Sequence, residues 1–214
     1  MRTLVLCDDR WHPARVPREG VSALQDRGFA FDWIENASEW TAELMLNYQL
    51  VVLTKSNHVS FTDHREWMTD ESQAAFVDYV RRGNGLLAIH SGTAGYQETP
   101  VLRNLLGGVF MHHPEQCEVT MDVDANHPMT VGASPFTIQD EHYFMAMGDH
   151  DVDIFMTTRS GHGHNVHVQP GGWCRSEGAG RVAVLTPGHN LEVWLHPSYQ
   201  ALILNALRWC GKIR

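Results

Sequence analysis

The sequence has no long hydrophobic run, no closely spaced cysteines and no excess of positive charge. Its apolar stretches are far shorter than the roughly 20 residues that a membrane-spanning helix needs. The formal net charge is -9, which disfavours nonspecific binding to nucleic acid or to an anionic membrane surface. We therefore expect neither a nucleic-acid partner nor a membrane partner.

The cysteines are few and widely separated, with no Cys-x-x-Cys pair: Cys7, Cys117, Cys174 and Cys210. This spacing is typical of reduced thiols in a cytoplasmic protein. The first ten residues, MRTLVLCDDR, contain only a four-residue apolar run, which predicts a first strand rather than a signal peptide. The expected location is the cytoplasm.

Internal repeats, linkers and low-complexity tracts are also missing. With 214 residues, of which 43% are hydrophobic, the chain is long enough for one domain with a large core. We expect a single domain over residues 1–214.

Strands and helices are predicted to alternate through the first half of the chain. Apolar runs predict strands over Thr3–Cys7, Phe29–Ile34, Leu50–Thr54 and Leu86–Ile89. Helical patterns separate or follow them over Pro17–Arg27, Glu39–Asn47 (capped by Ser38), Asp70–Arg82 (capped by Asp70) and Thr99–Leu106. This alternation predicts an α/β fold with a doubly wound, mainly parallel sheet.

The second half has a different character. Shorter strands are predicted over Cys117–Val123, Phe136–Gln139, Ile154–Thr158 and Arg181–Thr186, with a last helix over Ser198–Cys210. The polar, glycine-rich segment Ser160–Gly180 is predicted to be a long loop and a candidate mobile lid.

The most informative segment is GLLAIHSGTAGY (Gly85–Tyr96). An apolar strand leads to His90, and Ser91-Gly92 then turns into a predicted helix. This is the geometry of a nucleophile elbow, in which one side chain is held at the top of a sheet. Imidazole in that position favours metal binding or acid–base chemistry over thiol or acyl-enzyme chemistry. We expect His90 to face a solvent-accessible cleft.

Histidine is unusually abundant, with 14 residues, and many of them follow predicted strands. Because open α/β sheets bind ligands beyond the carboxyl ends of their strands, these histidines are expected to meet at one edge. Six segments contribute: His12, His58, His90, His112-His113, Asp140-Glu141-His142 and His189.

Such a set has two chemical uses. Three or four imidazoles with a carboxylate suit Zn, Mn, Fe, Co or Ni, and we take His90, His113 and His142 as candidate ligands. Without metal, the same groups would act as acid and base around a polyhydroxylated ligand. Simpler interpretations stay open, because His90 could be a core histidine, His113 a loop residue and Asp140-Glu141 a solvated turn.

Other candidate residues are less specific. The cluster His162, His164 and His167 is interpreted as a solvated segment that could chelate nickel adventitiously. Trp11 and Trp173 are predicted to lie in loops near the site, where they would either pack or stack on a sugar ring.

Several motifs together resemble one family. GLLAIHSGTAGY, LLGGVFMHHPEQ, NHPMTVG, FTIQDEHYF, GAGRVAVLTPGHN and LILNALRWC occur in the order typical of the ThuA-like (trehalose utilisation) family. That family belongs to the class I glutamine amidotransferase-like superfamily. The resemblance runs from about Leu4 to the C-terminus. It implies a flavodoxin-like three-layer α/β/α sandwich and a role in sugar catabolism.

The resemblance also implies site residues. The elbow motif falls on His90, the glycine-histidine-proline motif on His113, and the late glycine-histidine motif on Gly188 and His189. The DEHY motif falls on Asp140, Glu141, His142 and Tyr143, and His12 matches an early-loop histidine less securely. The segment QPGGWCRSEGAGRV departs from the family's Pro-x-x-Trp turn, so the substrate side of the pocket is expected to differ. Since the superfamily's catalytic cysteine is absent, amidotransferase activity is not implied.

Family members often sit beside oxidoreductases that make 3-keto sugars. The resemblance therefore implies an enzyme, a hydrolase or lyase, that acts on a keto-sugar or keto-glycoside, trehalose-related or other. We expect His90, Glu141, His142 and His189 to be catalytic. We expect His12, His58, Trp11 and Tyr143 to bind the carbohydrate, with Glu141 and His142 both reaching the cleft through a local turn. The alternative is a non-catalytic regulator that binds a carbohydrate or metabolite, and the sequence leaves a homo-oligomer open.

Overall fold

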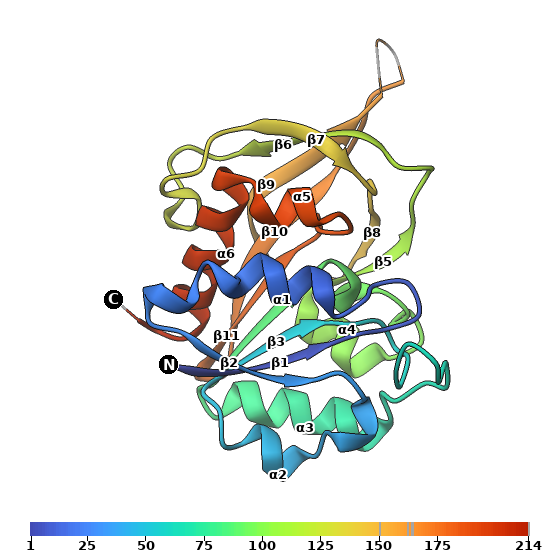
Figure 1. The fold of residues 1–214 in the computed structure, drawn as a ribbon, viewed down its shortest axis with the longest axis vertical. Coiled ribbons are helices and arrows are strands. Elements are labelled where there is room, and N and C mark those ends of the chain that lie inside the picture. Colours follow the sequence, from blue (N-terminus) through green and yellow to red (C-terminus); the bar gives the residue numbers. More distant parts are fainter. Residues whose placement is uncertain (150, 162, 164, 214) are drawn as a thin grey trace.

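The protein is built around one mixed β-sheet with helices on both faces (Figure 1). The computed structural model describes residues 1–149, 151–161, 163 and 165–213. Within these, nine strands form the sheet in the order β2-β1-β3-β4-β11-β10-β9-β6-β7. The parallel part consists of β2 (Ala30–Ile34), β1 (Arg2–Cys7), β3 (Leu50–Thr54), β4 (Gly85–Ile89) and β11 (Gly180–Leu185). This strand order is flavodoxin-like, as predicted.

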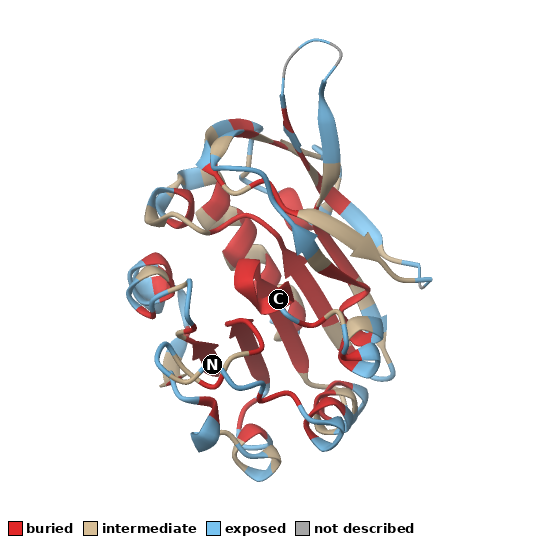
Figure 2. Ribbon diagram, turned by 90° about the vertical axis from the view of Figure 1, so that its right-hand side faces the viewer, coloured by how far each residue is buried: buried red, intermediate tan, exposed pale blue. Residues whose placement is uncertain are grey.

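Two layers of helices cover this parallel part. One face packs against α1 (Arg15–Ser22), α5 (Leu191–Leu195) and α6 (Pro197–Cys210), and the other against α2 (Ala42–Met45), α3 (Asp70–Arg81) and α4 (Pro100–Leu106). In β4, Leu87 and Ile89 point to the first core and Leu86 and Ala88 to the second. Figure 2 shows the central strands buried along their length, which explains why their sequences are continuously apolar.

The helix boundaries and caps differ from those predicted. Thr69, not Asp70, caps α3 by accepting a hydrogen bond from the backbone N–H of Ser72. The predicted helix over Glu39–Asn47 is divided into the 3₁₀ turn Ala37–Glu39 and the short α2, capped by Asn36 and Thr41 rather than by Ser38. The first helix likewise ends at Ser22 and is followed by a 3₁₀ turn over Gln25–Arg27. In each case a side-chain cap or a short 3₁₀ turn, rather than the apolar pattern, determines where the helix begins or ends.

Four antiparallel strands extend the sheet beyond β11. These are β10 (His167–Glu177), β9 (Asp153–Ser160), β6 (Cys117–Val123) and β7 (Phe136–Asp140), which follow β11 in that order. A separate two-stranded sheet joins β5 (Gly108–His112) to β8 (Phe144–Met147), two strands that the sequence pattern did not predict. The 3₁₀ turn Pro128–Thr130 connects β6 to β7.

The prediction of a mobile loop over Ser160–Gly180 is wrong. Most of this segment is β10, and Gly171, Gly172, Trp173 and Cys174 are buried in it. The glycines are needed for close packing, since a Cβ at Gly172 would lie 2.6 Å from the ring of Phe155. The glycines of this segment led to the prediction of a loop, although they are present because the strand is crowded. His162 and His164 of the expected chelating cluster lie outside the described residues.

Candidate functional site

A pocket of about 660 Å³ opens at the carboxyl ends of the parallel strands. Segments that follow β1, β3, β4, β5, β7 and β11 converge there, as expected from the position of the histidines. Its lining consists of Trp11, His12, Ser56, Asn57, His58, Ala94, Gly95, Gln97, Phe110, His113, Glu141, Tyr143 and His189.

His90 lies at the end of β4 in an elbow, with a backbone φ of 48°. Positive φ is uncommon for a residue with a side chain, and such strain is concentrated at functional sites. Residues His90–Thr93 form a 3₁₀ turn rather than the start of the predicted helix. Gly188 passes close by, because a Cβ there would lie 3.3 Å from Cβ of His90.

The expectation that His90 faces solvent is wrong. Its ring is only 1% exposed, because the ring of Tyr143 stacks on it at a centroid distance of 4.2 Å. Nδ1 of His90 lies 2.9 Å from the carbonyl oxygen of Thr186 and therefore carries the proton. Nε2 is then the acceptor, and it receives the hydroxyl of Tyr143 at 3.0 Å. The ring is thus buried among polar groups behind the pocket wall. Replacing it would cost stability as well as function.

His12 is oriented by Asp9, a residue that the sequence analysis did not select. Nδ1 of His12 lies 2.8 Å from Oδ1 of the fully buried Asp9, which also accepts the backbone N–H groups of Trp11 and Ser56. Burial disfavours the charged carboxylate, but the contacts with His12 and these N–H groups outweigh it and lower the pKa of Asp9 to about 2. Asp9 lies two residues after the first strand, and a carboxylate at that strand end is the sequence feature that could have identified it.

The protonation of His12 follows from its surroundings. Burial lowers its pKa, and although Asp9 opposes this, the ring is held below its ordinary value. The imidazole is therefore neutral at pH 7, with its proton on Nδ1 facing Asp9. The lone pair of Nε2 points toward the other histidines, and the ring meets those of His90 and His189 edge-on at centroid distances of 4.9 and 5.2 Å.

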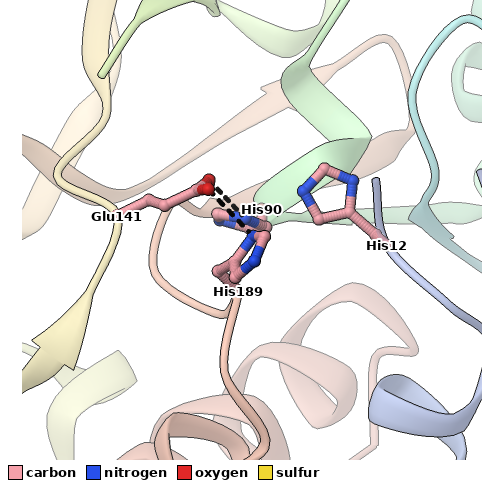
Figure 3. A group of neighbouring side chains, drawn as sticks. All are labelled: His12, His90, Glu141 and His189. Carbon is pink, nitrogen blue, oxygen red and sulfur yellow. Dashed lines mark ion pairs between the residues drawn. The ribbon is translucent and has the colours of Figure 1, made fainter. Parts of the chain in front are cut away.

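Glu141 and His189 form the charged pair of the site (Figure 3). Nδ1 of His189 lies 3.1 Å from Oε1 of Glu141, although the two groups are not aligned for a hydrogen bond. Burial works against both charges. Even so, His189 holds the pKa of Glu141 well below its usual range, and Glu141 raises the pKa of His189.

The DEHY segment remains extended, and the local turn that we predicted does not form. Glu141 and Tyr143 point into the pocket, whereas Asp140 and His142 point the opposite way, as alternation along an extended chain requires. Asp140 supports the site from behind by accepting the backbone N–H groups of Gly188 and His189 at 2.8 and 3.0 Å.

His142 is consequently not at the cleft. It is fully buried, and its Nδ1 lies 2.7 Å from Oγ of Ser160. The expectation that it reaches the pocket and binds metal is wrong. His113 does line the pocket, but its Nε2 reaches only to 3.5 Å from Glu141. Within the described residues, the four groups at this site with ligand atoms close enough for one metal ion are instead His12, His90, Glu141 and His189.

Of the other residues predicted to bind the substrate, some lie on the pocket wall and one is buried in the protein core. Trp11, which is 60% exposed, and His58 lie on the pocket wall with Tyr143. Trp173 is fully buried in β10 and donates its indole N–H to the carbonyl of Leu106, so the expectation that it stands near the site in a loop is wrong. None of the residues that line the pocket is a cysteine.

The fold and the site together define a flavodoxin-like α/β protein with an ionisable cluster at the carboxyl edge of its parallel strands. The family model of ThuA, described as trehalose utilisation, matches residues 5–210. The chain therefore belongs to the ThuA family. No curated protein matches it.

Solved structures show the same fold. A putative ThuA-like protein from Parabacteroides merdae superposes with a TM-score of 0.75 at 17% identity, covering 99% of this chain and 90% of that chain. A second, from Bacteroides uniformis, gives a TM-score of 0.72 at 21% identity, with 98% and 91% covered. A cytoplasmic protein from Salmonella typhimurium gives 0.70 at 14% identity, with 98% and 99% covered. None of the helices in the described part of this chain has the length and apolar character of a membrane span.

Proposed function

We propose that this protein is an enzyme that acts on a keto-sugar or keto-glycoside, with the pocket at the strand ends as its active site. One observation carries the proposal. Groups that hold a proton, Tyr143 and His189, line the same pocket as imidazoles that are able to accept one, His12 and His58. The pocket has a volume of about 660 Å³, which is large enough for a small carbohydrate. A regulator that only binds a sugar has no need for such a cluster.

The proposed reaction needs a proton donor for the ketone oxygen. Burial raises the pKa of Tyr143 well above its ordinary value, so the phenol keeps its proton. His189 is favoured in its charged form by Glu141. Both residues line the pocket. His189 can stabilise the negative charge that develops on the oxygen when the α-proton leaves, and Tyr143 can do so once its hydroxyl turns from Nε2 of His90 to the substrate.

The reaction also needs a proton acceptor for the carbon next to the ketone. Glu141 is a weak candidate, because its pKa is held far below neutrality and general bases work best near the working pH. The neutral imidazoles on the wall are better suited, and burial lowers the pKa of both His12 and His58. Loss of the α-proton gives an enolate. The enolate re-forms the ketone and makes a double bond to the neighbouring carbon as the glycosidic oxygen leaves, and that oxygen takes the proton that the imidazole had accepted.

The substrate class and the location belong to the same proposal. The exposed indole of Trp11 beside the polar cluster is suited to stack on a sugar ring. Two Salmonella typhimurium structures of this fold are described as cytoplasmic proteins, and all four thiols here are free, which supports a cytoplasmic location.

The proposal is tested by offering the protein a 3-keto-glycoside and its unoxidised parent glycoside in parallel. We expect release of the sugar or aglycone, followed by mass spectrometry, from the keto compound alone, because only the ketone makes the α-proton acidic. Binding of the keto compound without release would instead support the regulator. If the parent glycoside were cleaved equally fast, the ketone would have no part in the mechanism.

A bell-shaped pH profile is expected for kcat/KM. Activity should rise as the acceptor imidazole, with its lowered pKa, loses its proton, and should fall as pH passes through the raised pKa of His189. In His189→Gln the fall on the alkaline side should disappear while a rise on the acid side remains. An alkaline side that survives unchanged in this variant would exclude His189 as the acid.

A further inference from the structure

We infer that the floor of the pocket binds one divalent first-row transition-metal ion through four residues: His12, His90, Glu141 and His189. This inference rests on the geometry of the cluster and holds whether or not a keto-sugar is the substrate. Of the three ligands expected from the sequence, only His90 belongs to this set: His142 is buried on the other side of its segment, and His113 lines the pocket but is not among the four groups.

The spacing of the four groups fits one ion. Each residue offers one ligand atom, and all four atoms lie within 4.8 Å of one another. Bonds of about 2.0–2.1 Å in a tetrahedral site place ligand atoms about 3.4 Å apart, so small rotations of the side chains would close the site. Figure 3 shows the three imidazoles and the carboxylate grouped around one point, with side chains arriving from four separate segments.

Two buried nitrogen atoms in this group have no hydrogen-bond partner. They are Nε2 of His12 and Nδ1 of His189, and both belong to the short set of such atoms found among the described residues. A buried polar atom without a hydrogen-bond partner is unfavourable, because it has lost its contact with water and gained nothing in return. A metal ion bound between these two nitrogen atoms and the neighbouring carboxylate of Glu141 would give both nitrogens a partner.

The surrounding contacts set the tautomers that ligation requires. Nδ1 of His12 donates to Asp9, and Nδ1 of His90 donates to the carbonyl of Thr186, so each Nε2 presents a lone pair to the pocket side. Carboxylate or carbonyl partners on the far nitrogen are typical of metal-binding histidines. The main chain of His189 is itself fixed by the buried Asp140.

The donor set also limits the kind of metal. Ca²⁺ and Mg²⁺ prefer oxygen ligands, whereas three imidazoles and one carboxylate suit Zn²⁺, Co²⁺, Ni²⁺, Fe²⁺ or Mn²⁺. One group competes with the ion, because the hydroxyl of Tyr143 donates to Nε2 of His90 at 3.0 Å. Ligation by His90 requires that hydroxyl to turn away.

A bound ion would narrow the choice of proton acceptor in the proposed reaction. The lone pairs of His12 and His189 would both be engaged, which leaves His58 as the neutral imidazole on the wall. The ion would then replace His189 as the group that stabilises the ketone oxygen. The ion would polarise the ketone oxygen in addition to Tyr143.

The test is a titration of untagged, chelator-treated protein with Co²⁺, whose visible absorption reports nitrogen and carboxylate ligation, combined with calorimetry. His162, His164 and His167 are first replaced by Gln, so that adventitious chelation by this histidine-rich stretch of the sequence cannot be mistaken for the site. We expect one Co²⁺ per chain and competition by Zn²⁺. His12→Gln and His189→Gln should each lower the affinity by at least about 100-fold, since even the partners of metal ligands are worth about 10–100-fold. His112→Gln, an exposed histidine on β5, is the matched control and should bind normally.

A further variant separates ligation from proton transfer. Tyr143→Phe removes the group that competes for Nε2 of His90, so Co²⁺ affinity should be unchanged or higher while turnover of the keto-glycoside falls. The inference would be overturned if the protein with the three histidines replaced showed no saturable binding. It would also be overturned if His12→Gln and His189→Gln bound Co²⁺ as tightly as that parent protein. Because no substrate is used in the titration, failure of the keto-sugar proposal would leave this result standing.

Discussion

Glu141→Gln is expected to lower turnover of the keto-glycoside by at least about 100-fold, the lower end of what general acid–base groups contribute. The change keeps the shape of the side chain and removes its charge. His189 then loses the carboxylate 3.1 Å away that raises its pKa and becomes a weaker proton donor at neutral pH. The alkaline side of the pH profile should accordingly move to lower pH.

The control for this variant is Glu115→Gln, an exposed glutamate in the loop after β5. Its turnover should match that of the unmodified protein, and thermal melting should show both variants folded. Near-normal turnover in Glu141→Gln would demote Glu141 to a structural role and leave the histidines to carry the chemistry.

The convergence of the site could be predicted because it depends on topology. Parallel strands end at one edge of a sheet, so residues following β1, β3, β4 and β11 had to meet there once these strands were recognised. His12, His58 and His189 were found in this way, and all three line the pocket. The apolar runs of these strands are the strongest signal in the sequence, because both of their faces are covered by helices.

The direction of individual side chains could not be predicted from the same signal. Whether the DEHY segment turns or stays extended decides whether His142 or Tyr143 enters the pocket, and neighbouring strands settle that choice. The segment stays extended because β7, which precedes it, pairs with β6, and β8, which follows it, pairs with β5. His142 is therefore carried to the opposite side, where Ser160 and Thr158 satisfy its nitrogens.

The close packing around the glycines could not be predicted from the sequence either. In Ser160–Gly180 the glycines suggested a loop, yet Gly171 and Gly172 are where β10 crowds against β9. A sequence gives no sign of the neighbour that makes a glycine necessary. The role of Asp9 was missed for a related reason, since its importance comes from a contact with His12 in a tight loop rather than from any motif.

The same argument makes Gly92 the most sensitive position of the elbow. A Cβ at residue 92 would lie 1.9 Å from the carbonyl oxygen of Leu53 in β3, a backbone atom that cannot move without disturbing the parallel sheet. Gly92→Ala is therefore expected to destabilise the fold by at least about 3 kcal/mol, the upper end for overpacking. This corresponds to a fall in Tm of about 6–12 °C for a chain of this size. Any folded fraction should also lose activity, because the turn that holds His90 would be displaced.

Ser91→Ala is the matched control in the same turn. The hydroxyl of Ser91 is buried and has no hydrogen-bond partner, so its removal should leave Tm unchanged or slightly raised. Gly92→Ala adds a carbon atom that would press against β3, whereas Ser91→Ala removes an oxygen atom that has no hydrogen-bond partner. If Gly92→Ala melted within about 2 °C of the unmodified protein, the expected effect at Tm of less than 1 kcal/mol would show that the elbow can move away from Leu53. The close approach of this turn to β3 would then not be what holds His90 in place.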